Sequence, residues 1–210
     1  RYTAAPGVIV SSFARLLGRG RPYVDRGGCR PWDELAYATL PALHLFANLR
    51  NSSVENQSIV ILDFGAQYSQ LIARRVREQN VFSVVLPCNA SLKEIRSYSP
   101  LGIIFSGGPS SVYDADAPEA EKQVFELGVP VLGICYGLQF MVHALGGKVR
   151  PAPRREYGHA RVEVTGKSAL FEGLPSQLEV WMSHGDEALE LPAGFTLTAK
   201  SPSAVAAVEN

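Results

Sequence analysis

Residues 131–139 read VLGICYGLQ, in which a short apolar run leads into a cysteine that lies between two glycines. The apolar run is typical of a strand buried on both faces, and the residues after Gly137 are typical of a helix. The segment 133–137 has the spacing of a nucleophile elbow, a tight strand-to-helix turn that exposes its central side chain. We therefore predict an α/β sheet with Cys135 at the carboxyl end of one strand.

Apolar runs alternate with helical patterns on the N-terminal side of this segment. We expect strands at 59–62, 82–86, 101–105 and 129–134, and helices at 67–79, 91–97, 118–127 and 137–145. Strands that alternate with helices predict a doubly wound, mostly parallel sheet. After Lys148 the pattern becomes β-rich, with expected strands at 160–164, 179–182, 195–199 and 204–208.

The composition of the 210 residues is that of an ordinary globular protein, with 46% hydrophobic and 19% charged residues. The formal net charge of zero argues against a dedicated nucleic-acid binder. Three cysteines are too few for a disulfide scaffold, so we expect reduced thiols and a cytoplasmic protein. No run of about 18 apolar residues occurs, and we expect no membrane-spanning helix.

Residues 1–57 differ from the rest of the chain. They carry seven Arg and four acidic residues, a balance of +3, which leaves −3 for residues 58–210. We predict an Arg-rich, poorly ordered or artefactual extension at 1–57, whose one helical candidate, 33–50, is interrupted by Pro41. A transit peptide is the alternative, which the acidic residues of the extension weaken. Residues 58–210 form the predicted domain.

Three features are expected at the carboxyl ends of the strands. Cys135 at a helix N-terminus is favoured as a thiolate nucleophile, and the backbone N–H of Tyr136 would face a developing oxyanion. The alternative for Cys135 is a small buried side chain. The SGGP segment 106–109 is either a second oxyanion donor or an ordinary tight turn. The WMSHGD segment 181–186 follows a predicted strand as a polar turn, and His184 is either a base or a loop histidine.

Five segments together resemble a known family. They are DFGAQY at 63–68, SGGP at 106–109, GICYGLQ at 133–139, REYG at 155–158 and WMSHGD at 181–186. These segments are similar to those of the triad-type (class I) glutamine amidotransferase domain of GMP synthases. The resemblance extends over residues 58–210.

The resemblance implies a flavodoxin-like amidotransferase fold and a reaction. Cys135 would attack glutamine to form a thioester, Gly108 and Tyr136 would be the oxyanion donors, and the substrate would be held by Gln139, Gly107, Ser183 and His184. The ammonia would pass to a synthetase domain that aminates XMP. The resemblance implies no cofactor in this chain, and it assigns ATP and Mg to that synthetase domain. It implies glutamine and the synthetase domain as partners, a homodimer of the full-length protein, and neither nucleic acid nor membrane.

One part of the family pattern is not found in the 210 residues. The family's base comes from a His-Pro-Glu segment, and none of the four histidines here is followed by Pro-Glu. We therefore expect a domain truncated before its base, with little turnover of its own. One alternative is a non-catalytic binding or regulatory module with the same fold. Another is a peptidase-like hydrolase with an elbow cysteine, which the REYG and WMSHGD segments oppose.

Overall fold

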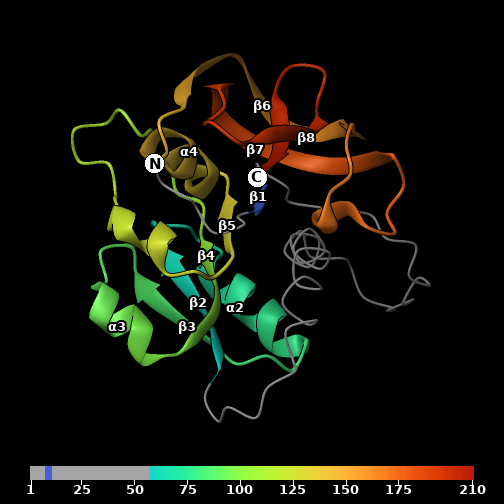
Figure 1. Ribbon diagram of the computed structural model, residues 1–210. Helices are drawn as coiled ribbons and strands as arrows, with labels where there is room; N and C mark the ends of the chain where they lie inside the picture. Colours follow the sequence, from blue (N-terminus) through green and yellow to red (C-terminus); the bar gives the residue numbers. More distant parts are fainter. Residues whose placement is uncertain (1–7, 11–56) are drawn as a thin grey trace, which may run out of the picture.

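The computed structural model of the chain describes residues 8–10 and 57–210, and for residues 8–10 and 153–156 it describes the backbone alone. In chain order, its strands are β1 (Val8–Val10), β2 (Ser58–Asp63), β3 (Ser83–Pro87), β4 (Pro100–Phe105), β5 (Val131–Ile134), β6 (Lys148–Val164), β7 (Gln177–Glu190), β8 (Thr196–Lys200) and β9 (Val205–Glu209). They form one nine-stranded sheet in the order β3-β2-β4-β5-β1-β9-β8-β6-β7 (Figure 1).

The first half of the sheet is parallel and carries helices on both faces. The helices are α2 (Ser69–Glu78), α3 (Leu92–Ser97) and α4 (Tyr136–Ala144). Ile59 and Ile61 of β2 pack in one core cluster with residues of α2, whereas Val60 and Leu62 pack in a second cluster with residues of α3 and α4. Successive strand residues point to opposite faces, so one buried strand supplies both clusters. The predicted doubly wound sheet is confirmed.

The second half of the sheet is antiparallel and is dominated by the pairing of β6 with β7. Ala160 lies opposite Val180, and Val162 lies opposite Leu178. Val162, Val180 and Leu178 belong to the same core cluster as α2, so the antiparallel half closes over one face of the parallel half. The predicted β-rich C-terminal part is confirmed, although β6 and β7 are longer than the segments that we expected.

The helix expected at 118–127 is wrong in type and length. The structure has a 3₁₀-helix, η2 (Lys122–Glu126), and Glu121 before it is extended. The Tyr136 hydroxyl donates a hydrogen bond to the Pro118 carbonyl at 2.8 Å, and Ala120 is buried in the core beside it. These contacts hold the residues before Lys122 in an extended path. A tertiary contact therefore overrides the local helical pattern.

The segment before Ser58 contains a strand that we did not expect. β1 runs parallel to β5, with Val10 opposite Ile134, and antiparallel to β9, with Val8 opposite Glu209. It therefore joins the two halves of the sheet. The helical candidate at 33–50 lies outside the described residues.

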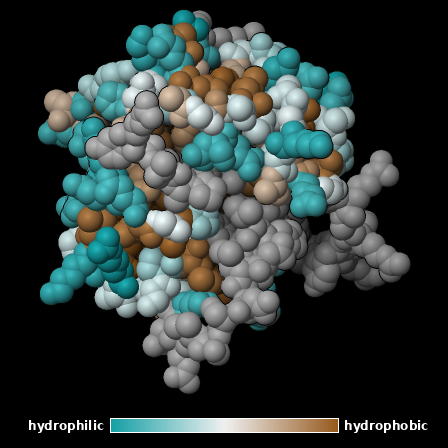
Figure 2. Space-filling model, viewed as in Figure 1, coloured by the Kyte–Doolittle hydropathy of each residue, from teal (hydrophilic) through white to brown (hydrophobic). Residues whose placement is uncertain are grey.

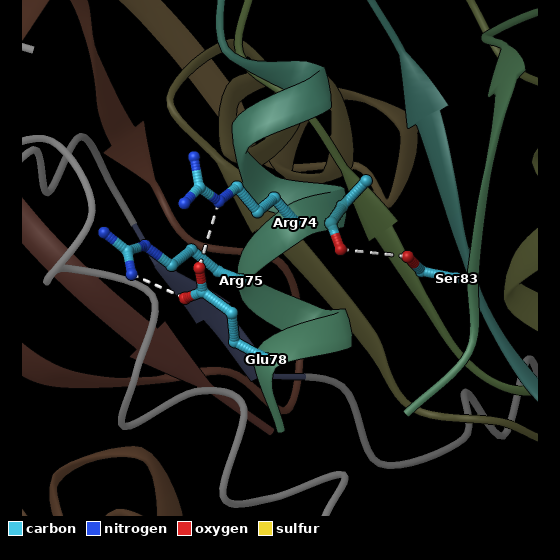
Figure 3. A network of polar contacts seen from close by, with 5 residues as sticks. Arg74, Arg75, Glu78 and Ser83 are labelled. Atoms are coloured by element: carbon cyan, nitrogen blue, oxygen red, sulfur yellow. Dashed lines mark hydrogen bonds and ion pairs between the residues drawn. The ribbon is translucent and has the colours of Figure 1, made fainter. Parts of the chain in front are cut away.

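Helix α2 is attached to the amino-terminal end of β3 (Figure 3). The Ser83 hydroxyl donates to the Ala73 carbonyl at 3.0 Å. Arg77 donates to the Ser83 carbonyl at 2.9 Å. On the outer side of the helix, Arg74 and Arg75 both pair with the Glu78 carboxylate. Arg74 is exposed and Arg75 is partly buried, while the buried Ser83 fixes the helix at the end of the sheet opposite to the elbow.

The surface drawn in Figure 2 mixes hydrophilic and hydrophobic residues. The described residues with exposed large hydrophobic side chains are Tyr68, Phe82, Tyr113, Tyr157, Trp181, Leu189 and Leu197. Within the described part of the chain, none of the helices is long and apolar enough to cross a membrane.

Candidate functional site

The carboxyl ends of three neighbouring strands meet at the site. Strand β4 lies between β2 and β5, with Leu62 opposite Phe105 and Phe105 opposite Gly133. The residues that follow these positions are therefore brought to one edge of the sheet. Cys135 and the SGGP segment 106–109, which are separated in the sequence, lie side by side there, as open parallel sheets favour.

The turn at Cys135 has the geometry predicted for an elbow. Cys135 is the N-cap of α4 and has φ 53° and ψ −110°, a backbone conformation that side-chain-bearing residues rarely adopt. Its carbonyl accepts the first helical hydrogen bond, from Gln139 at 3.1 Å. A Cβ at Gly133 would lie 2.7 Å from the Met141 sulfur, and one at Gly137 would lie 2.5 Å from the Phe105 carbonyl oxygen. A side chain would not fit at either position, so both must be glycine.

The thiol of Cys135 faces strand β7. Its Sγ donates to the Ser183 carbonyl at 3.4 Å, and the side chain is only partly buried. The other described cysteine, Cys88, is also free and partly buried. Burial raises the pKa of the Cys88 thiol, and the nearby Asp63 charge acts in the same direction. Cys88 is therefore held in its protonated, less nucleophilic form.

The glycine segment lies against the elbow. A Cβ at Gly107 would be 3.5 Å from the Cys135 Cβ, and one at Gly108 would be 3.5 Å from the Tyr136 Cβ. The Cβ at Gly108 would also be 2.5 Å from the Phe64 carbonyl oxygen, so only glycine fits there. The structure therefore places the two expected oxyanion donors, Gly108 and Tyr136, next to each other.

The WMSHGD segment is part of a strand, and our expectation of a turn there is wrong. Strand β7 continues through these residues, with Ser183 paired to Tyr157 and His184 paired to Glu156 on β6. Burial alternates along the strand, and His184 lies on the buried side. The long pairing with β6 overrides the turn signal of the Ser-His-Gly sequence.

Two expected substrate-binding side chains contact one backbone carbonyl. Gln139 Nε2 donates to the Asp186 carbonyl at 3.1 Å, and His184 Nδ1 lies 3.1 Å from the same oxygen. Because a carbonyl oxygen only accepts, this contact places a proton on His184 Nδ1. Both side chains are buried. The Gln139 bond links the first turns of α4 to β7, whereas the His184 contact lies within β7.

Asp63 and Ser106 form a polar network that the sequence did not lead us to assign to the site. Asp63 Oδ1 accepts hydrogen bonds from the backbone N–H groups of Gly65 and Ala66, at 2.9 and 3.2 Å, and from the Ser69 hydroxyl at 2.7 Å. Ser106 is fully buried, and its hydroxyl accepts from the Phe64 N–H at 2.9 Å. The signal in the sequence is the Asp before Phe-Gly at a strand end, which is typical of a turn residue.

No metal centre accompanies this arrangement in the part of the chain that is described. Among residues 8–10 and 57–210, no three or more His, Cys, Asp or Glu side chains are grouped so that they could hold a metal ion. The chemistry that the described side chains can support is covalent catalysis by a cysteine, with backbone N–H groups beside it.

The region that carries the glycine-flanked cysteine elbow matches a known family. The model of the family Glutamine amidotransferase class-I matches residues 60–210. The chain belongs to this family. The matched amidotransferase region includes every residue of the site described above.

Curated relatives of this amidotransferase chain are GMP synthases. The glutamine-hydrolyzing GMP synthase of Brachyspira hyodysenteriae is 52% identical over 153 residues, which are 72% of this chain and 30% of the relative. That of Enterococcus faecalis is 55% identical over 139 residues, 66% of this chain and 27% of the relative. The chain therefore spans about 30% of the length of the curated relatives that it matches.

A solved structure with the same fold comes from Thermoplasma acidophilum, and that protein is described as a GMP synthase component. It is 28% identical with a TM-score of 0.61, and the match covers 73% of this chain and 77% of that one. The amidotransferase fold of this chain is thus shared with that protein.

We expect Tyr136→Phe to lower stability without affecting the reactivity of the site. The Tyr136 side chain is almost fully buried, burial raises the pKa of its hydroxyl to about 12, and the hydroxyl donates to the Pro118 carbonyl. Losing this bond should cost about 1–2 kcal/mol of unfolding free energy, measured by urea titration. The backbone N–H is unchanged, so the rate at which a glutamine analogue modifies Cys135 should stay within about twofold. A large fall in that rate would show that the side chain itself is needed.

Proposed function

We propose that this domain is the glutaminase part of a GMP synthase, which hydrolyses glutamine at Cys135 and supplies ammonia for the conversion of XMP to GMP. The observation that carries the proposal is the strained elbow of Cys135 with Gly107 and Gly108 packed directly against it. The curated relatives are GMP synthases, which supports XMP as the acceptor of the ammonia.

The proposed chemistry is acyl transfer to water through a thioester. The Cys135 thiolate attacks the side-chain amide carbon of glutamine, a C–S bond forms, and an electron pair moves to the amide oxygen. The N–H groups of Gly108 and Tyr136 stabilise this oxyanion. The amide nitrogen takes up a proton, which balances the one that the thiol released, and it leaves as ammonia when the oxyanion collapses and the C–N bond breaks. Water then hydrolyses the thioester to glutamate and restores the thiol.

The substrate would lie between α4 and β7. Gln139 of α4 donates to the Asp186 carbonyl of β7, and the Ser183 carbonyl accepts from the Cys135 thiol. We propose that the Gln139 carboxamide and the segment 183–184 contact the amino-acid end of glutamine, and that Gly107 leaves room for its side chain.

We propose that none of the three described histidines is the base of the reaction. His143 packs against the Tyr113 ring, His159 packs against the Trp181 ring, and His184 faces the Asp186 carbonyl. The 210-residue chain should therefore release glutamate from glutamine only slowly. Appreciable glutaminase activity of this chain that is lost in His184→Ala would contradict this part of the proposal.

The amination of XMP is proposed to take place on a separate synthetase domain. The curated relatives are about three times as long as the region they share with this chain, which leaves room for such a domain in them. ATP and Mg²⁺ would bind there. The Gly-Lys-Ser at 166–168 of this chain is preceded at position 161 by Arg and not by the glycine that begins a phosphate-binding loop. A cytoplasmic location and a homodimer of the whole protein are part of the same proposal.

A chloroketone analogue of L-glutamine tests the glutaminase proposal directly. We expect it to modify the chain at one site, with a rate that saturates as its concentration rises. L-Glutamine should protect against modification, and D-glutamine should not, because the site binds the amino-acid end. Absence of saturable, glutamine-protected modification would favour a non-catalytic binding module with the same fold.

A further inference from the structure

We propose that Ser106 is a positioning residue of the oxyanion site. Its hydroxyl holds the carbonyl of Gly107 and thereby aims the N–H of Gly108 at the reacting oxygen. This inference rests on the proposed function, in which the Gly108 N–H is an oxyanion donor.

The Ser106 hydroxyl makes two short contacts in a fully buried position. It donates to the Gly107 carbonyl at 2.9 Å and accepts from the Phe64 N–H at 2.9 Å. Asp63 Oδ1, at 3.5 Å, is the second acceptor within its reach. A hydroxyl has one proton, and the shorter contact is the one to the Gly107 carbonyl. The carbonyl oxygen of Gly107 is therefore held on the side of the loop that faces Ser106.

The carbonyl of Gly107 and the N–H of Gly108 belong to one peptide plane. In a trans peptide, these two groups point in opposite directions. Fixing the carbonyl therefore fixes the direction of the N–H. The peptide lies between two glycines, which allow many backbone conformations, so without the hydroxyl it could rotate and carry its N–H away from the site.

The Ser106 backbone is itself anchored on both sides. Its N–H donates to the Leu62 carbonyl at 3.0 Å, and its carbonyl accepts from the Gly137 N–H at 3.1 Å. The first bond ties it to the end of β2, and the second ties it to the first turn of α4. The hydroxyl thus occupies a fixed position relative to Cys135, as a positioning role requires.

The partner that orients the hydroxyl is also fixed. Asp63 Oδ1 holds the backbone N–H groups of Gly65 and Ala66, which keeps the turn after β2 in place. The Phe64 N–H in this turn points to Ser106, and the Phe64 carbonyl lies directly against Gly108. Two loops and the elbow thus form one hydrogen-bonded unit around the Gly107–Gly108 peptide.

Two reagents with different transition states test the proposal on the 210-residue chain. The thiolate attacks the ketone carbon of the chloroketone analogue of L-glutamine, which puts negative charge on the oxygen. The sulfur then displaces chloride from the neighbouring methylene carbon, its bond to the ketone carbon breaks, and the C=O bond forms again, which leaves a stable thioether. Iodoacetamide reacts by direct displacement of iodide, and no oxyanion forms. We expect Ser106→Ala to lower the saturating rate of chloroketone modification about 10- to 100-fold. The half-saturating concentration and the iodoacetamide rate should stay within about twofold.

Ser83→Ala is the matched control. Ser83 is also a buried serine, and its hydroxyl makes one short hydrogen bond where that of Ser106 makes two, but this bond joins α2 to β3 at the other end of the sheet. Ser83→Ala should lower thermal stability and leave both modification rates unchanged. Ser106→Thr keeps the hydroxyl and should recover most of the chloroketone rate.

Two results would overturn the positioning role of Ser106. One is an equal fall in both rates in Ser106→Ala, which would indicate a general disturbance of the thiol. The other is an unchanged chloroketone rate in a variant that retains its fold. In both cases the chain with its original sequence would still react with the chloroketone, and glutamine would still protect it. The glutaminase proposal would therefore stand. If the chain with its original sequence does not react with the chloroketone, both proposals fail together.

Discussion

We expect Cys135→Ala to lower modification by the chloroketone analogue of L-glutamine by at least about a thousandfold. No other described cysteine lies at the junction of the elbow, the glycine segment and β7. Alanine keeps the small volume of the site, so the fold should persist. The remaining modification is measured as the change in intact protein mass over time.

Cys88→Ala is the control for this prediction. The Cys88 thiol has a pKa raised by burial and lies after β3 rather than on the elbow. Its replacement should leave the rate of chloroketone modification within about twofold of the rate for the chain without substitutions. A loss of modification in Cys88→Ala, with normal modification in Cys135→Ala, would contradict the assignment of the nucleophile.

The second large effect is expected for Gly137→Ala, which should lower the free energy of unfolding by about 3 kcal/mol or more. The added Cβ would lie 2.5 Å from the Phe105 carbonyl oxygen and 2.7 Å from the Phe105 Cβ. These atoms belong to a central strand, so neither can move without disturbing β4. The change is measured by urea unfolding followed by circular dichroism.

Gly166→Ala is the matched control, because it adds the same methyl group at a glycine where there is room for it. A Cβ at Gly166 would meet its nearest atom, the Leu197 carbonyl oxygen, at an ordinary contact distance of 3.5 Å. We therefore expect the free energy of unfolding to change by no more than about 0.5 kcal/mol. Equal stability losses in the two variants would show that the close approach of α4 to β4 does not explain the glycine at position 137.

The parallel half of the fold could be predicted from the sequence because its strands are buried on both faces. The continuous apolar run 59–62 and the run 101–105 predict such strands without any long-range information. The glycine after α4, Gly146, has φ 91° and ends the helix as its sequence position indicates.

Elements that depend on distant partners were harder to predict. The helix expected at 118–127 is replaced by η2 because the Tyr136 hydroxyl and the core hold the preceding residues extended. The segment 183–186 reads as a turn, yet Ser183, His184 and Asp186 pair with β6 across a shift in register. β1 has only three residues, and its place between β5 and β9 is set by pairing alone.

The candidate site could be predicted in its residues but not in its hydrogen bonds. The elbow spacing placed Cys135 at the end of a strand, and the order of the strands brought Gly107 and Gly108 beside it. The link from Ser106 to the Gly107 carbonyl depends on side-chain directions that no sequence pattern encodes. The contact of Gln139 with the Asp186 carbonyl depends on how β7 lies against α4.

Peptide mapping of the chain after modification by the chloroketone analogue tests the glutaminase assignment most directly. We predict a single modified peptide that contains Cys135, and its formation should be suppressed by L-glutamine. Glutamine-protected modification found on Cys29 or Cys88, with Cys135 unmodified, would contradict the assignment of the elbow as the glutaminase site.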